Sequence, residues 1–288
     1  MAGVSGRPTP RARALVLPAP PFRGVRLDRL LSWTGRRLAA SLSLIAVAIA
    51  WEAVSRSGLV TDYLLPPPSA VIERVGSDVV SGQLAVNLGL TLYRAFVGFL
   101  VAAALGIALG ILMARNAWVH WFFDPIISVG FPMPKIAFVP IFMLWFGLYD
   151  FSKISMAVFN AIFPVITATL AATEGVEREI LWSARSLGAG DRDLLWEIIL
   201  PAALPQILTG LQVALPVSMI VTVVTEMLMG GLGLGAAMIN ASRFADSPGV
   251  FAGIVEIAVV GYCVVRGMAA LRRRLLIWHQ EFQDPTTV

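Results

Sequence analysis

The sequence predicts an all-α polytopic membrane protein with six transmembrane helices. Hydrophobic residues make up 57% of the 288 residues and charged residues only 14%, whereas a soluble domain is nearer about half apolar and about a quarter charged. The mean hydropathy is +0.78, and the apolar residues are concentrated in long uncharged runs. Runs of about 20 apolar residues are long enough to cross a bilayer as helices.

Each apolar run accounts for one predicted span. In chain order the six spans are residues 38–56, 91–113, 126–147, 152–172, 207–229 and 250–271. The third is the least regular, because prolines and Lys135 interrupt it. Between the first two spans, Ser69 follows a proline run and is expected to cap a short amphipathic surface helix over residues 70–80.

The predicted membrane domain, residues 38–278, lies between two other segments. Residues 1–37 hold eight arginines, five prolines and one acidic residue, and such a composition favours a disordered basic arm. We do not interpret the arm as a signal peptide, because the apolar run begins late and no small-residue cleavage site follows it. Residues 279–288 are predicted to be a cytoplasmic tail.

The lysines and arginines other than Arg94 and Lys135 indicate the orientation in the membrane. With the N-terminus in the cytoplasm, sixteen of them fall on the cytoplasmic side and four on the outer side. Cytoplasmic loops of membrane proteins carry this excess of positive charge. Both termini and the loop over residues 173–206 are therefore predicted to be cytoplasmic, and the N-terminal arm is then a cytoplasmic one.

Several function classes are disfavoured by composition. The single cysteine, Cys263, rules out a disulfide within the chain, and His120 and His279 lack the spacing of metal ligands. The basic residues cluster at the ends with few aromatics among them, so no nucleic-acid partner is expected. No phosphate-binding glycine loop precedes either lysine, and the glycine run at 230–235 lacks a surrounding βαβ unit and is expected to be a turn. No catalytic or metal site is predicted.

The loop over residues 173–206 is predicted to fold as a helix–glycine–helix elbow. Acidic residues from Glu174 onwards favour a helix N-terminus, and Gly188 can adopt the left-handed conformation that ends a helix. Asp191 is expected to cap a second short helix, which Pro201 and Pro205 end before the next span. An ordinary amphipathic connector lying on the membrane surface is the alternative that these residues leave open.

The loop also carries a sequence pattern. Ala184, Gly188, Ile198, Leu200 and Pro201 fit the pattern E-A-A-x3-G-x9-I-x-L-P, and the loop thus resembles the EAA loop of ABC importer permeases. In that family the loop docks into a groove on a separate ATPase subunit. The resemblance implies a type I importer permease fold, with ATP and Mg²⁺ bound by the partner and no cofactor in this chain.

The match departs from the pattern at its first two positions. Trp182 and Ser183 stand where the pattern has its glutamate and first alanine, and Glu179, one helical turn earlier, is expected to replace the glutamate on the same face. The predicted ATPase-coupling residues are Glu179, Ala184, Leu187, Gly188, Ile198, Leu200 and Pro201.

Other stretches resemble permeases of the nitrate/sulfonate/taurine group. They are Leu65–Ser69, Thr91–Arg94, Pro132–Lys135 with Ile141–Gly147, Glu226–Met227 and Ser242–Gly253. The resemblance implies a bacterial inner-membrane importer of a small solute such as a sulfonate, taurine or nitrate. Its implied partners are a second copy of this chain, two copies of an ABC ATPase and a periplasmic binding protein.

Charged residues inside the spans are candidates for lining the translocation path. A charge that faces lipid costs several kcal/mol, so such residues usually face a cavity or a partner. The charges that qualify are those of Arg94, Lys135, Glu226 and Glu52, with Glu256 a weaker case. The candidates for the path are Arg94, Lys135 and Glu226, of which Lys135 could attract an anion. A lipid-interface anchor for Arg94 and an ion pair with another span for Glu226 are the alternatives.

Two other classes of protein fit the sequence less well. A secondary carrier would need paired buried carboxylates and broken helices in matching halves, whereas this sequence has scattered single acids and no internal repeat. A membrane-embedded enzyme would need a clustered nucleophile or metal motif, and none is evident. Dependence on a co-expressed ATPase separates the importer from both.

Overall fold

The computed structural model describes residues 42, 43 and 45–277, and this part contains helices and turns but no strand. The predicted arm, residues 1–37, and the predicted tail, residues 279–288, lie outside the described residues. The first predicted span is described only in part, with residues 45–56 helical. Of the described residues, those from Trp51 to Ile277 belong to one compact unit.

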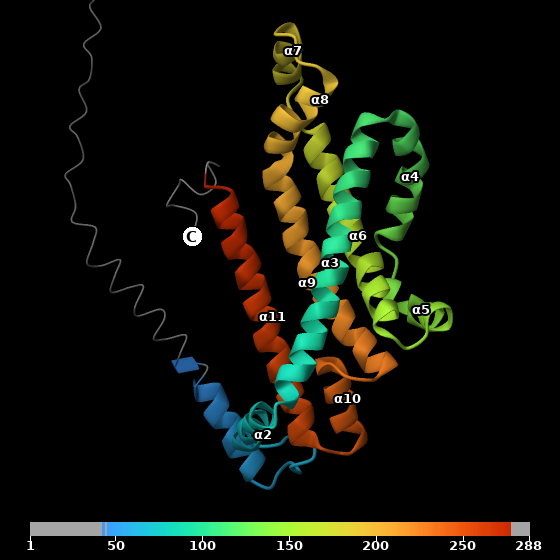
Figure 1. Cartoon of the computed structure of the whole chain (residues 1–288). Helices are drawn as coiled ribbons and strands as arrows, with labels where there is room; N and C mark the ends of the chain where they lie inside the picture. Colours follow the sequence, from blue (N-terminus) through green and yellow to red (C-terminus); the bar gives the residue numbers. More distant parts are fainter. Residues whose placement is uncertain (1–41, 44, 278–288) are drawn as a thin grey trace, which may run out of the picture. The chain divides into compact units, whose positions relative to one another are not determined.

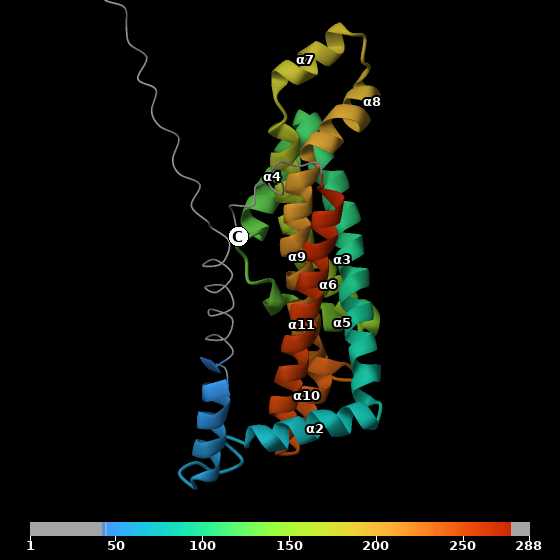
Figure 2. The same cartoon turned by 90° about the vertical axis from the view of Figure 1, so that its left-hand side faces the viewer.

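Four long helices confirm four of the predicted spans. They are α3 (Gln83–Arg115), α6 (Asp150–Glu174), α9 (Leu200–Met229) and α11 (Ser247–Leu275). All four are long and apolar enough to cross a membrane, and each extends beyond the apolar run that predicted it. Helices α3, α6 and α11 run in one direction and α9 runs in the other (Figures 1 and 2).

The third predicted span is not one helix. Residues Ala117–Gly130 form α4, and a 3-10 turn η1 (Lys135–Phe138) leads into α5 (Val139–Phe146). The two helical pieces are bent by 97° at the break between them. Proline at 132 and 134 removes two backbone donors at this point, which explains the break. The helix also begins nine residues before the predicted start at 126, because the Asn116 side chain caps it and accepts from the Trp118 and Val119 amides at 2.9 and 3.3 Å.

The predicted surface helix is present, but its cap differs from the prediction. Helix α2 (Pro68–Val80) begins after Pro67, so Ser69 lies within its first turn. The Ser69 amide donates to Glu52 Oε2 at 3.1 Å and its hydroxyl donates to Glu52 Oε1 at 2.9 Å. A carboxylate 17 residues earlier thus supplies the cap that the sequence assigned to Ser69.

Short helices occupy the two ends of the compact unit. At one end, α7 (Arg178–Ser186), α8 (Asp191–Asp193) and the π turn η2 (Leu194–Ile199) project beyond the long helices. At the other end, α2 lies across the ends of the long helices (Figure 2). Helix α10 (Leu234–Arg243) lies at the same end and connects α9 to α11. The glycine run at 230–235 forms the turn that the sequence predicts, and α10 follows it.

Three glycines of α3 pack directly against α6. A Cβ atom added at Gly98, Gly106 or Gly110 would lie 2.6, 2.8 or 2.7 Å from a side-chain atom of α6. Such spacing is closer than packed carbon atoms tolerate, so glycine allows the two backbones to approach. The small-residue face of α3 therefore serves packing within the chain.

This packing can be tested at Gly106. The Gly106→Ala substitution is expected to lower the free energy of unfolding by about 1–3 kcal/mol, because the new methyl would overlap Val165. A methyl group added at Gly89, also in α3, would meet no atom within 4 Å, so Gly89→Ala is the matched control and should not destabilise the protein. Thermal unfolding of the purified protein in detergent measures both. Equal melting of the two variants would contradict the close α3–α6 contact.

Candidate functional site

The first helix of the elbow ends at Gly188. Helix α7 is followed by Gly188 with a φ of 92°, the left-handed conformation that the sequence predicted. The Gly188 amide donates to the Arg185 carbonyl at 3.0 Å, and the Ala189 amide donates to the Ala184 carbonyl at 3.1 Å. This pair of bonds is a Schellman motif. The carbonyls of Ala184 and Arg185 thus accept from the two residues after the cap, which requires the left-handed conformation at Gly188.

The second arm of the elbow is continuous with span five, contrary to the prediction. The chain is helical without interruption from Asp191 to Met229, through α8, η2 and α9. Neither Pro201 nor Pro205 ends the helix, since Pro201 lies in the first turn of α9 and Pro205 lies inside it. The π turn η2 directly precedes α9, and π turns accommodate local irregularities in the bonding of a helix.

The N-cap of this arm is Gly190, one residue before the predicted Asp191. Gly190 precedes the helix and Asp191 is its first residue. The Asp193 carboxylate accepts from the Gly190 amide at 3.0 Å. The carboxylate that secures the start of the helix is therefore that of Asp193.

The elbow exposes large apolar side chains. The exposed fractions are 59% for Trp182, 90% for Leu187 and 63% for Trp196. Helix α7 has no buried residue. Of the predicted coupling residues, Glu179, Leu187, Gly188 and Pro201 are exposed, and Ala184, Ile198 and Leu200 are half-buried. Exposed Trp and Leu side chains on a projecting element are typical of a protein–protein contact. We call Trp182, Leu187 and Trp196 the elbow patch.

Two of the predicted path residues form a buried ion pair. Arg94 of α3 and Glu226 of α9 lie 2.5 Å apart between Nη1 and Oε1, with side chains 4% and 0% exposed. Arg94 also pairs with Asp150 at the start of α6, at 2.7 Å. Thr91 donates to Glu226 Oε2 at 2.8 Å. The arrangement joins three long helices, which agrees with the ion-pair alternative for Glu226.

This network also holds the glycine turn after α9. Arg94 donates to the Leu232 carbonyl at 2.6 Å, and Lys153 of α6 donates to the Gly230 carbonyl at 2.7 Å. The Gly235 amide donates to Glu226 Oε2 at 3.1 Å. A Cβ atom at Gly233 would overlap the Glu226 carboxylate, so the turn approaches the ion pair as closely as only glycine permits.

Two further bonds secure the turn from α3. The Gly233 amide donates to Asn87 Oδ1 at 3.0 Å, and the Leu234 amide donates to Thr91 Oγ1 at 2.9 Å. Asn87, Asp150 and Lys153 were not selected from the sequence. The sequence did contain a hint for Asp150 and Lys153. They are opposite charges one helical turn apart at the start of a span, a pattern that indicates an ion-pair network.

Lys135 lies in a different environment. Its ammonium donates to the Phe131 carbonyl at 2.9 Å and lies 4.5 Å from the centre of the Phe163 ring. The side chain therefore stabilises the bend between α4 and α5 through a backbone bond and a cation–π contact. The structure brings Arg94 and Glu226 together and places Lys135 in a separate set of contacts.

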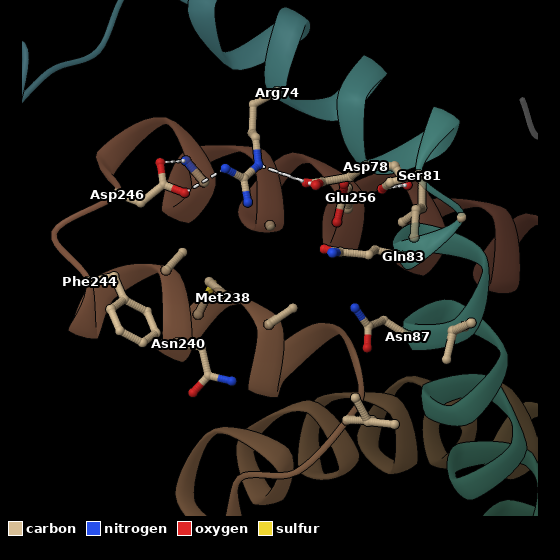
Figure 3. A pocket seen from close by; sticks show the side chains of 18 of the residues that line it. Arg74, Asp78, Ser81, Gln83, Asn87, Met238, Asn240, Phe244, Asp246 and Glu256 are labelled. Carbon is tan, nitrogen blue, oxygen red and sulfur yellow. Dashed lines mark hydrogen bonds and ion pairs between the residues drawn. The ribbon is translucent and has the colours of Figure 1, made fainter.

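A cavity of about 500 Å³ with four charged residues in its lining lies at the end of the unit away from the elbow (Figure 3). Helices α2, α3, α10 and α11 contribute to it, and Gly231 and Leu232 of the glycine turn form part of its wall. Its charged residues are Arg74, Asp78, Asp246 and Glu256. Among the described residues, no group of three or more His, Cys, Asp or Glu side chains is placed to hold a metal ion.

The region from the middle of α3 to the end of α11 carries a family signature. Residues 106–277 match the family described as "Binding-protein-dependent transport system inner membrane component". The chain belongs to this family of ABC importer permeases. The permease is therefore a transport subunit and an inner-membrane component.

The permease is similar to named transport permeases over most of its length. It is 35% identical over 266 residues to the taurine transport system permease protein TauC of Escherichia coli strain K12, a match that covers 89% of this chain and 96% of that one. It is 34% identical over 243 residues to the putative aliphatic sulfonates transport permease protein SsuC of Bacillus subtilis strain 168, covering 84% and 88% of the two chains. These relatives confirm the resemblance to the nitrate/sulfonate/taurine group of permeases.

The fold of the permease is similar to that of a solved transporter. A chain in a crystal structure of the inward-facing MetNI methionine ABC transporter superposes with a TM-score of 0.58. The match covers 68% of the permease and 98% of that chain, at 17% sequence identity. At this identity the likeness shows the fold alone, and it confirms an ABC permease architecture.

Proposed function

We propose that the permease, paired with a second copy of itself, forms the translocation path of an ATP-driven importer for a sulfonate such as taurine. The solute class rests on TauC and SsuC, which are 35% and 34% identical to the permease. The formylaminopyrimidine transport permease protein ThiX of Halalkalibacterium halodurans is 30% identical, so a small heterocyclic solute is the second candidate.

The observation that carries the proposal is the continuity of the elbow with α9. A docked ATPase would contact the elbow patch, and the unbroken helix from Asp191 to Met229 would carry its displacement into the membrane. A flexible connector lying on the membrane surface would absorb the same displacement. Two ATPase copies, which bind the ATP and Mg²⁺, would engage the two elbows of the dimer.

The orientation proposed from the charges agrees with this arrangement. The elbow and both termini would face the cytoplasm of a bacterium, and the end that carries α2 and α10 would face the periplasm. The binding protein implied by the family description would dock at that second end. ATP binding would draw the elbows together and open the path outward, and hydrolysis would reset it inward, which is alternating access between two states.

The charged residues of the spans then take two roles. Arg94 and Glu226 hold the glycine turn against α3 and α6. We propose that they thereby fix the relative positions of α3, α6 and α9 at this end of the path. Lys135 has no carboxylate partner among the described residues. A cation without a carboxylate partner, beside the break of α4 and α5, suits the attraction of an anionic sulfonate.

Co-purification with an ATPase tests the proposal. The permease is expressed with candidate ABC ATPases, isolated through a tag on the permease, and assayed for ATP hydrolysis and for taurine uptake into vesicles. The Trp182→Ser substitution in the elbow patch is expected to reduce ATPase recovery by about tenfold, since buried Trp side chains dominate such contacts. Trp121 is 73% exposed and lies in α4, so Trp121→Ser is the matched control.

Two outcomes would contradict the proposal. Taurine uptake driven by an ion gradient in the absence of any ATPase would make the protein a secondary carrier. Equal ATPase recovery with Trp182→Ser and with the wild type would separate ATPase binding from the elbow patch.

A further inference from the structure

The cavity at the end opposite the elbow has an unbalanced charge. One guanidinium, that of Arg74, faces three carboxylates, those of Asp78, Asp246 and Glu256, a formal balance of −2. Arg74 is already engaged, because it bonds to Asp246 at 2.7 Å and to Asp78 at 3.2 Å. Glu256 is thus left without a cationic partner among the described residues of the cavity.

Glu256 has a second distinguishing feature. Its Oε1 atom is shielded from solvent and has no hydrogen-bond partner in the described part of the chain. A shielded carboxylate oxygen without a donor costs free energy until a donor reaches it. In Figure 3 the Glu256 and Asp78 side chains lie beside each other above Gln83. A cationic donor that entered the cavity would meet both carboxylates.

The same charges make the sulfonate group of the proposed solute a poor occupant. That group is negatively charged, even in zwitterionic taurine, and three carboxylates facing a single, already paired arginine would repel it. The amide side chains of Gln83 and Asn240 add further hydrogen-bonding groups to the lining. The lining therefore favours an ammonium or guanidinium group.

We propose that this cavity receives a lysine or arginine side chain of the substrate-binding protein when that protein docks. The inference rests on the proposed function, which places this end of the permease in the periplasm. The volume of about 500 Å³ accommodates a long basic side chain, and the exposed ring of Phe244, 84% accessible, lies at the cavity and can cover its apolar stem.

The cavity borders the glycine turn that ends α9, so a docked side chain would contact this turn. Gly231 and Leu232 line the cavity, and the carbonyl of Leu232 accepts from Arg94 at 2.6 Å. A basic side chain in the cavity would therefore contact the turn that ends α9. Because α9 is continuous with the elbow, the docked state at one end can bias the position of the other.

The test measures the affinity of the transporter's own binding protein for the permease–ATPase complex in lipid nanodiscs. The Glu256→Gln variant is expected to raise the Kd by about tenfold at low ionic strength. The salt dependence of binding should become shallower in this variant, because one screened attraction is lost. Glu73 is exposed on α2 and lies outside the cavity lining, so Glu73→Gln removes the same charge as the matched control and should leave the Kd within about twofold.

A second variant, at an exposed position, keeps the test informative if Glu256→Gln fails to fold. Gln83 is an exposed residue of the lining, and Gln83→Lys places a permanent cation in the cavity. This variant should also raise the Kd by about tenfold, because the tethered ammonium competes with the incoming one. Wild-type affinity in both variants would overturn the inference.

Two further results are decisive. If the purified permease binds Ca²⁺ and loses it in Glu256→Gln while binding-protein affinity is unchanged, the cavity is a cation site and the inference is wrong. If the wild-type complex is neither bound nor stimulated by the binding protein, the proposed function itself fails and the inference fails with it.

Discussion

Replacing Glu226 with alanine is expected to lower the free energy of unfolding of the permease by about 3–5 kcal/mol. Arg94 is only 4% exposed, so its guanidinium would remain buried without its main partner. The Thr91 hydroxyl and the Gly235 amide would lose their acceptor in the same substitution. Asp150, with a side chain 49% exposed, is too solvated to compensate for the lost carboxylate.

Thermal unfolding of the purified protein and hydrogen exchange at residues 230–235 measure this effect. The glycine turn should exchange faster in Glu226→Ala, because Arg94 no longer holds the Leu232 carbonyl in place. Glu73→Ala removes an exposed carboxylate and should change stability by less than about 0.5 kcal/mol. The double variant Arg94→Met with Glu226→Met should be more stable than Glu226→Ala, because the charge of Arg94 is no longer left buried without its carboxylate. If the double variant were the less stable of the two, the cost of an unpaired Arg94 could not be the explanation.

Replacing Gly188 with proline is expected to abolish uptake and the stimulation of ATP hydrolysis by the binding protein. Proline holds φ near about −65°, whereas Gly188 has a φ of 92°. Proline also removes the amide that donates to the Arg185 carbonyl. The chain would then leave α7 in a different direction, and α7 and α8 would meet at a different angle. The elbow patch could not engage the ATPase in the same way.

A graded series separates backbone conformation from side-chain size. Gly188→Ala should give a partial loss, since a left-handed alanine costs about 1–2 kcal/mol and its Cβ meets no atom within 4 Å. Gly190, two residues later, has a φ of −77°, so Gly190→Ala should couple like the wild type. The readout is the ratio of ATP hydrolysis with and without binding protein in vesicles. Equal loss in both alanine variants would rule out the left-handed turn as the cause.

The fold was largely predictable because the membrane imposes a minimum length on each apolar run. Runs of apolar residues near the bilayer thickness located α3, α6, α9 and α11. The main error in the predicted helix ends concerns proline residues. Proline at 132 and 134 does break the third span, yet Pro201 and Pro205 lie in one continuous helix. The local rule is the same in all four cases, and the difference comes from the adjacent π turn and from packing against α3 and α6, which a single sequence does not encode locally.

The sequence singled out residues of the candidate site but not their partners. The motif spacing located Gly188, and the Schellman bonds show how its left-handed conformation ends α7. Arg94 and Glu226 stood out as charges within spans, but their pairing joins residues 132 positions apart. The cavity depends on four helices and has no local signature in the sequence. Asn87 and Lys153 were missed because each acts through a bond to the backbone of a distant turn.

The unbroken helix from Asp191 to Met229 links the two ends of the permease mechanically. At about 1.5 Å per residue its axis is roughly 58 Å long, about twice the roughly 30 Å hydrocarbon thickness of a bilayer. Within the membrane part, α9 packs against α3 and α6, and the Arg94–Glu226 pair fixes its far end to α3. A displacement of the elbow would therefore tilt α3, α6 and α9 together. In the proposed dimer, drawing the two elbows together would tilt these helices in each copy, so one motion would close one side of the path as it opens the other.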